Sequence, residues 1–88
     1  MARYNLEFRP SVSRDLKGVP SQDLKKILAR IEGLRDNPRP VGSVKLSGFE
    51  YYRVRQGDYR IVYEIEDNKL IVIVVKVGHR REVYRGKA

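Results

Sequence analysis

Cysteine is absent from this chain of 88 residues, and histidine occurs only once. Without thiols the chain can form no disulfide framework, no thiolate metal site and no cysteine nucleophile. A single histidine cannot supply the ligand cluster of a typical zinc or copper site. We therefore expect neither a metal nor another cofactor, and zinc fingers and thiol-dependent enzymes are excluded.

Long apolar runs are also missing. The longest, from Leu70 to Val75, has the length of a strand and falls far short of the roughly 18 apolar residues that cross a bilayer. The segment after Met1 goes directly into alternating residues, without the apolar core or cleavage site of a signal peptide. We therefore expect a cytoplasmic protein with no membrane partner. Since a chain this short can build only one core, residues 1–88 should form a single domain.

Acidic residues are few beside basic ones. Eleven Asp and Glu stand against nineteen Lys and Arg, which gives a net charge of +8. So large an excess on a small surface favours a polyanion as partner. The alternative is that the charge only keeps the protein soluble. The placement of the basic residues in the fold has to distinguish the two interpretations.

The first part of the chain predicts a strand and two helices. Residues 4–8 alternate between apolar and polar types, as in a half-buried strand. Pro10 suits the first turn of a short helix that Gly18 stops, and Ser21 is a candidate N-cap of a longer helix that Asn37-Pro38 closes. We expect this helical hairpin to pack its apolar residues on a sheet: Val12, Leu16, Leu24, Ile27, Leu28, Ile31 and Leu34.

The rest of the chain predicts strands. Four runs are rich in Val, Ile and Tyr and are separated by turn residues: Val44–Leu46, Tyr51–Arg55, Tyr59–Glu66 and Lys69–Val77. The last run is apolar at nearly every position, which is typical of a strand inside a sheet. The predicted fold class is therefore α+β, a helical hairpin packed on a twisted, mainly antiparallel sheet in the order β-α-α-β-β-β, with or without one further strand.

Alternation places several basic residues on one face of this sheet. If Tyr52, Val54, Ile61 and Tyr63 point to the core, then Arg53, Arg55 and Arg60 converge on the opposite face. Directly opposed like charges weaken a hairpin, and an anionic ligand would relieve that cost. The pattern predicts a phosphate-binding face.

A second basic cluster follows the last strand and includes an aromatic residue. It comprises Arg80, Arg81, Tyr84 and Arg85. Basic residues interleaved with an aromatic suit RNA, because unpaired bases stack on rings while arginines hold phosphates. In the alternative interpretation the arginines form a solvated tail and Tyr84 anchors it to the core.

His79, Glu64 and Glu66 are the remaining candidates for chemistry. Histidine titrates near neutral pH and is a common acid or base, although a histidine beside Gly78 also suits a turn. The two glutamates alternate along one strand, where acids more often pair with Arg and Lys than hold a metal. We expect ion pairs for them.

Four segments together resemble the successive signatures of the RelE/ParE toxin superfamily. They are Lys45-Leu46-Ser47-Gly48, Tyr52-Arg53-Val54-Arg55, Gly57-Asp58-Tyr59-Arg60-Ile61-Val62-Tyr63 and Val77-Gly78-His79-Arg80-Arg81-Glu82-Val83-Tyr84. The order of predicted elements is similar as well, so the resemblance spans nearly the whole chain. It implies a type II toxin that a cognate antitoxin neutralises and that meets operator DNA only through the antitoxin complex. We expect an antitoxin segment that folds around the toxin and places acidic residues against its arginines.

In the RelE branch, the resemblance implies a ribosome-dependent endoribonuclease that cuts mRNA in the ribosomal A site without a metal. The nucleotide's own 2′-hydroxyl attacks the neighbouring phosphate and leaves a cyclic phosphate and a freed 5′-hydroxyl. Carried over by position, Arg60 stabilises charge on the phosphate, Arg80 does so and serves the leaving oxygen, and Tyr84 stacks on a base.

Arg53 and Arg55 depart from the family pattern, because well-studied relatives carry lysines at the matching positions. A lysine can lose its proton and act as a base, whereas a guanidinium stays charged. The two arginines are therefore expected to clamp phosphate, and the general base stays open with His79 as a candidate. The resemblance and the basic pattern give these further RNA-binding candidates: Tyr51, His79, Arg81, Arg85 and Lys45.

Two other functions are compatible with the sequence. A ParE-like toxin would share the fold but would act on DNA gyrase by binding, and a non-catalytic RNA-binding or ribosome-associated module would use the same basic residues only to hold phosphates. The presence of Arg60, Arg80 and Tyr84 together favours the nuclease over the gyrase inhibitor. A cleavage assay separates the nuclease from the binding module.

Overall fold

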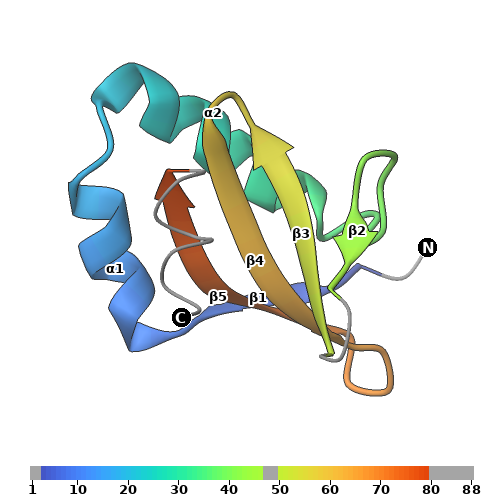
Figure 1. Ribbon diagram of the computed structural model, residues 1–88. Coiled ribbons are helices and arrows are strands. Elements are labelled where there is room, and N and C mark those ends of the chain that lie inside the picture. Colours follow the sequence, from blue (N-terminus) through green and yellow to red (C-terminus); the bar gives the residue numbers. More distant parts are fainter. Residues whose placement is uncertain (1–2, 47–49, 80–88) are drawn as a thin grey trace.

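A single mixed sheet organises the chain in the computed structural model, which describes residues 3–46 and 50–79 (Figure 1). The elements follow the order β1 (Asn5–Phe8), α1 (Pro10–Lys17), α2 (Ser21–Gly33), β2 (Val44–Lys45), β3 (Tyr51–Gln56), β4 (Tyr59–Glu66) and β5 (Ile71–His79). The strand order is β1-β5-β4-β3-β2, with β1 parallel to β5 and all other neighbours antiparallel. The predicted α+β fold is confirmed, and the apolar last strand lies inside the sheet between β1 and β4. Within the described part of the chain, no helix is long and apolar enough to span a membrane.

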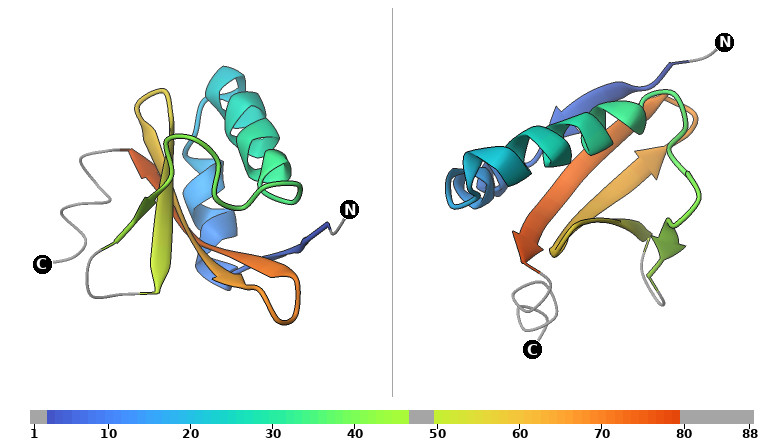
Figure 2. Two further views of the ribbon diagram at one scale, coloured as in Figure 1. Left: turned by 90° about the vertical axis from the view of Figure 1, so that its right-hand side faces the viewer. Right: turned by 90° about the horizontal axis from the view of Figure 1, so that it is seen from above.

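Both helices cover the same face of the sheet (Figure 2). The core between the two layers consists of Val12, Ile27, Ile31 and Leu34 from the helical layer and Val54, Ile61, Tyr63, Val72, Val74 and Val77 from the strands. Leu16 packs against the edge of this core. The predicted burial of Leu28 is wrong, because this side chain is 43% exposed. At 3.6 residues per turn Ile27 and Ile31 share the face toward the sheet, and Leu28 is rotated away from it by about 100°.

Several element boundaries differ from the sequence-based expectation, most of them by one or two residues. Ser21 is the first residue of α2 and not its N-cap, since Pro20 holds that position without a side-chain hydrogen bond. The helix ends at Gly33, earlier than Asn37-Pro38, and the chain continues through a tight turn. The last strand starts later than predicted because Leu70 has φ = 55°, which belongs to the turn before it. His79 lies in β5 and is therefore not a turn residue.

A β-bulge shifts the pairing of the two longest strands. Val62 pairs with Lys76, but the next residue Tyr63 pairs with Val74, so β5 has one extra residue at this point. Beyond the bulge Arg60 pairs with Gly78. An extra residue reverses which side chains point to each face of a strand. The bulge therefore decides which residues of the β5 end share a face with Arg60.

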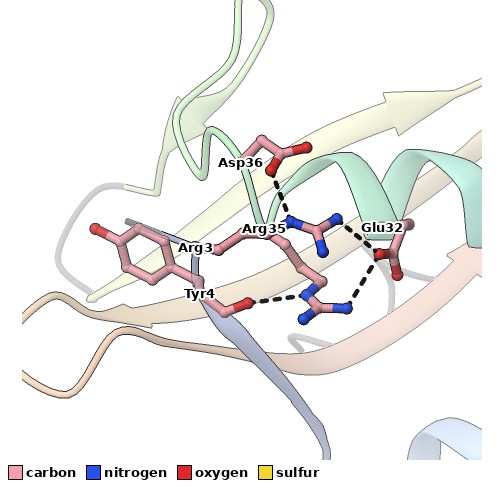
Figure 3. Close-up of polar contacts among 5 residues, drawn as sticks. All are labelled: Arg3, Tyr4, Glu32, Arg35 and Asp36. Carbon is pink, nitrogen blue, oxygen red and sulfur yellow. Dashed lines mark hydrogen bonds and ion pairs between the residues drawn. The ribbon is translucent and has the colours of Figure 1, made fainter. Parts of the chain in front are cut away.

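Ion pairs and hydrogen bonds join the two residues before β1 to the last turn of α2 and to the turn that follows it (Figure 3). Arg3 donates to Asp36 Oδ1 at 2.8 Å and to Glu32 Oε2 at 3.1 Å. Arg35 donates to the same carboxylate oxygen of Glu32 at 3.1 Å and, through Nε, to the carbonyl oxygen of Tyr4 at 2.9 Å. The network fixes where β1 enters the sheet.

Tyr63 gives the fold a defined response to alkaline pH. Its side chain is fully buried, its hydroxyl donates to the carbonyl oxygen of Pro38 at 2.7 Å, and burial raises its pKa to about 12. Because the folded pKa lies above the unfolded value of about 10, the contribution to stability is complete below pH 10 and is lost as the pH rises toward about 12. Two pKa units correspond to about 3 kcal/mol.

The free energy of unfolding should fall between pH 8 and pH 12 in both wild type and Tyr63→Phe. We expect the fall to be smaller in Tyr63→Phe by up to about 3 kcal/mol, because phenylalanine has no hydroxyl to ionise. Urea denaturation at both pH values measures the difference. Val41→Ala, which removes an exposed side chain that does not titrate, is the control and should retain the wild-type pH dependence. Equal losses in wild type and Tyr63→Phe would contradict the assignment.

Candidate functional site

Three arginines share the face of the sheet that points away from the helices. Arg55 pairs directly with Arg60, and Arg53 pairs with Val62. Directly opposed residues of an antiparallel pair lie on the same face, as do residues two apart in one strand. The alternate positions Val54 and Ile61 are buried in the core under the helices. The structure thus brings Arg53, Arg55 and Arg60 together, and their chemical roles stay predictions.

Arg60 is the most buried of these cations, with 6% of its surface exposed. Its Nη1 donates to the carbonyl oxygen of Tyr59 at 3.4 Å, and its buried Nε has no hydrogen-bond partner among the residues that the structure describes. Within residues 3–46 and 50–79, no carboxylate is close enough to form an ion pair with Arg60 or Arg55. A buried charge beside a second cation is costly unless an anion compensates it. The pair is therefore suited to bind an anionic group.

The two candidate glutamates of β4 form ion pairs away from the arginine pair. Glu64 accepts a hydrogen bond from Arg9 at 2.8 Å, and Glu66 lies 3.8 Å from the ammonium of Lys69. The prediction that these two glutamates form ion pairs is confirmed. In the described ranges, no three or more His, Asp and Glu side chains gather as they would around a metal ion.

His79 lies on the other face of the sheet from Arg60. It pairs with Tyr59, one position from the Arg60–Gly78 pair, so its ring points toward the helical layer. The rings of His79 and Tyr59 meet edge to face with centroids 5.7 Å apart, and both residues line a hollow with Asp15 of α1. This placement does not support His79 as a base acting beside Arg60.

The other RNA-binding candidates divide into three groups. Tyr51 pairs with Glu64 and shares the face of the arginines. Lys45 pairs with Tyr52 and so projects on the helical side of the sheet. The remaining predicted residues lie outside the described ranges: Arg80, Arg81, Tyr84 and Arg85.

Sequence reasoning missed two neighbours of the arginines. Lys76 pairs with Val62, so its side chain leaves β5 on the face of the arginines, and its ammonium lies 3.8 Å from Oδ1 of Asp15 in α1. Gly78 lies beside Arg60 with no side chain of its own. Strict alternation from the buried Val74 would have pointed Lys76 into the core. The bulge reverses that direction. The apolar residues of the run do not indicate a bulge, and its one charged residue, Lys76, is the only sign in the sequence that the direction changes.

The comparisons with known proteins agree on one family. Residues 6–84 match the family described as the ParE toxin of the type II toxin–antitoxin system parDE. The chain is 31% identical over 86 residues to toxin RelG of Mycobacterium tuberculosis, which covers 93% of this chain and 97% of that protein. It is 29% identical to the mRNA interferase toxin RelE of Escherichia coli, over 92% of this chain and 90% of the relative. Its fold is similar to that in the crystal structure of the toxin–antitoxin complex RelBE2 from Mycobacterium tuberculosis, with a TM-score of 0.79 and 26% identity over 90% of this chain and 100% of that chain.

Proposed function

The chain belongs to the ParE toxin family of type II toxin–antitoxin systems and is a RelE-like toxin, and from this premise we propose that it is an endoribonuclease that cuts mRNA in the ribosomal A site. The relative in Escherichia coli is named an mRNA interferase, which supports a nuclease role. The observation that carries the proposal is the Arg55–Arg60 pair, in which a buried guanidinium has an unused donor and no described carboxylate beside it.

The proposed reaction requires charge stabilisation more than a protein nucleophile. The 2′-oxygen of the nucleotide bonds to the adjacent phosphorus as the bond to the 5′-oxygen breaks, so the 2′-hydroxyl loses a proton and the leaving oxygen gains one. Negative charge builds on the phosphate oxygens between these events. Arg60 would donate to them from a desolvated position, where a preorganised donor is most effective, and Arg55 would hold the phosphate.

The residues after β5 would complete the site. On the sequence resemblance, Arg80 stabilises the phosphate and serves the leaving oxygen by donating a hydrogen bond to it, and Tyr84 stacks on a base. Arginines keep their protons, so the proton of the 2′-hydroxyl has to go to another acceptor. In-line positioning of that hydroxyl by the ribosome and by Tyr84 would then supply much of the rate.

The proposed partners follow from this activity. The solved relative is a toxin–antitoxin complex, and we infer that this chain also has a cognate antitoxin, whose acidic residues would neutralise the arginine face. Operator DNA would be reached only through that complex. Since its substrate is mRNA on ribosomes, the toxin would act in the cytoplasm.

Primer extension on programmed ribosomes tests the function. We expect cleavage of the mRNA in the A site and little cleavage of the same RNA without ribosomes, because the site depends on the ribosome to align the 2′-hydroxyl. A parallel assay of DNA supercoiling tests the ParE-like alternative, which the family match keeps open. Inhibition of gyrase with intact mRNA would overturn the proposal, as would RNA binding without any cleavage.

A further inference from the structure

Among the described residues, the C-terminal half of β5 has a strand on only one side. Its parallel pairing with β1 ends where Phe8 meets Val74, and the N–H of Arg9 makes the last hydrogen bond to the Val74 carbonyl at 2.9 Å. β5 nevertheless continues to His79 along β4. Over these last residues, helix α1 takes the place beside β5 (Figure 1).

Asp15 of α1 supplies the hydrogen bond that a neighbouring strand would otherwise provide. Its Oδ2 accepts the main-chain N–H of Val77 at 3.1 Å, and its Oδ1 lies 3.8 Å from the ammonium of Lys76. The Asp15 side chain is 16% exposed and Val77 is 2% exposed, so this bond satisfies a donor that water reaches poorly. Leaving such a donor unpaired is unfavourable.

The two residues that Asp15 contacts, Lys76 and Val77, lie next to the Arg55–Arg60 pair. We call the hydrogen bond from Val77 N–H to Asp15 the Asp15 clamp. Val77 immediately precedes Gly78, which pairs with Arg60, and the same strand end leads in sequence to Arg80. The β-bulge just before Lys76 interrupts the regular ladder there and weakens the local restraint from β4. Asp15 therefore restrains the segment of β5 at which the sheet itself restrains it least.

We propose that Asp15 is a positioning residue, which fixes the end of β5 so that Gly78 keeps Arg60 in the geometry that the scissile phosphate requires. This role rests on the proposed nuclease function. Asp15 would act from the helical side through the Val77 N–H and would not touch the RNA. A displacement of about 1 Å at a reacting group can slow a reaction by about 10²-fold, so a single clamp can affect the rate strongly.

Two substitutions test the clamp. Asp15→Ala removes the acceptor, whereas Asp15→Asn keeps an oxygen that can accept the Val77 N–H. With toxin in excess over programmed ribosomes, we expect Asp15→Ala to lower the saturating single-turnover rate by about 10-fold or more while the half-saturating concentration stays within about twofold of wild type. Asp15→Asn should restore most of the rate. Hydrogen exchange of the Val77 amide, followed by NMR on the free toxin, should accelerate in Asp15→Ala and not in Asp15→Asn.

Ile31→Ala is the matched control, since it removes buried contacts of α2 from the core without touching β5's clamp. At a temperature at which every variant is folded, it should keep the wild-type saturating rate. Equal losses in Asp15→Ala and Ile31→Ala would overturn the positioning role and indicate general destabilisation. An unchanged Val77 exchange rate in Asp15→Ala would overturn the clamp itself, whereas absence of cleavage by wild type would refute the proposed function and, with it, the role of Asp15 in the reaction.

Discussion

Replacing Arg60 with alanine should lower the single-turnover rate of mRNA cleavage on programmed ribosomes by about 10²-fold or more. The reason is the position of this guanidinium, which is buried, lies beside Arg55 and keeps an unused donor. A donor of this kind stabilises the charge that develops on the phosphate at little cost of reorganisation. The fold should hardly change, because no described carboxylate loses an ion-pair partner.

Arg14→Ala is the control for this prediction. Arg14 is an exposed cation near the end of α1, in the layer on the other side of the sheet from Arg60, so its loss lowers the net charge equally without altering the arginine face. It should retain nearly the wild-type rate. The same resemblance that assigns Arg60 predicts a comparable loss for Arg80→Ala. A wild-type rate for Arg60→Ala, measured with a folded variant, would show that this face does not take part in catalysis.

Replacing Ile31 with alanine should lower the free energy of unfolding by about 2–5 kcal/mol, which is the usual range for truncating a fully buried isoleucine or leucine. Ile31 is 1% exposed and packs between α2 and the sheet. Leu28→Ala, three positions earlier in the same helix, should cost about 1 kcal/mol or less, since 43% of the Leu28 side chain already meets water.

Urea denaturation of the two variants at one pH gives both values. Because the substitutions lie in one helix and remove side chains of equal size, differences in helix propensity contribute little to the contrast. Similar losses in the two variants would mean that α2 turns a different face to the sheet. A large loss in Leu28→Ala together with a small loss in Ile31→Ala would mean that α2 packs on the sheet with Leu28 and not with Ile31.

Local periodicity predicts much of this fold because the elements near the arginines follow simple rules. The alternation of Tyr52 with Arg53 and of Ile61 with Arg60 suffices to place the arginines opposite the core. The periodicity of α2 predicts a helix, but an apolar stripe that contains both Ile27 and Leu28 is wider than the face that packs on the sheet. Which of the two is buried depends on the orientation of the helix, which is a tertiary property, and for that reason the predicted burial of Leu28 is wrong.

The C-terminal end of β5 shows where sequence reasoning stops. Whether Lys76 points with the core or with the arginines depends on one extra residue in an apolar run, and an apolar run carries no alternation that would reveal a bulge. The Asp15–Val77 hydrogen bond joins residues 62 positions apart, and it depends on how α1 packs against the end of β5. Only the assembled structure brings these groups together.

The parallel pairing of β1 with β5 also determines how late in its synthesis the toxin can complete its sheet. Asn5 pairs with Ile71, so the first strand has to find a partner that is translated 66 positions later. At about 5–20 residues per second, the ribosome making the protein completes that partner roughly 3–13 s after β1. Contacts between such distant segments form late. We therefore expect the nascent chain to stay harmless to the ribosome that makes it, because the strand that sets Gly78 beside Arg60 is synthesised after all the other described strands.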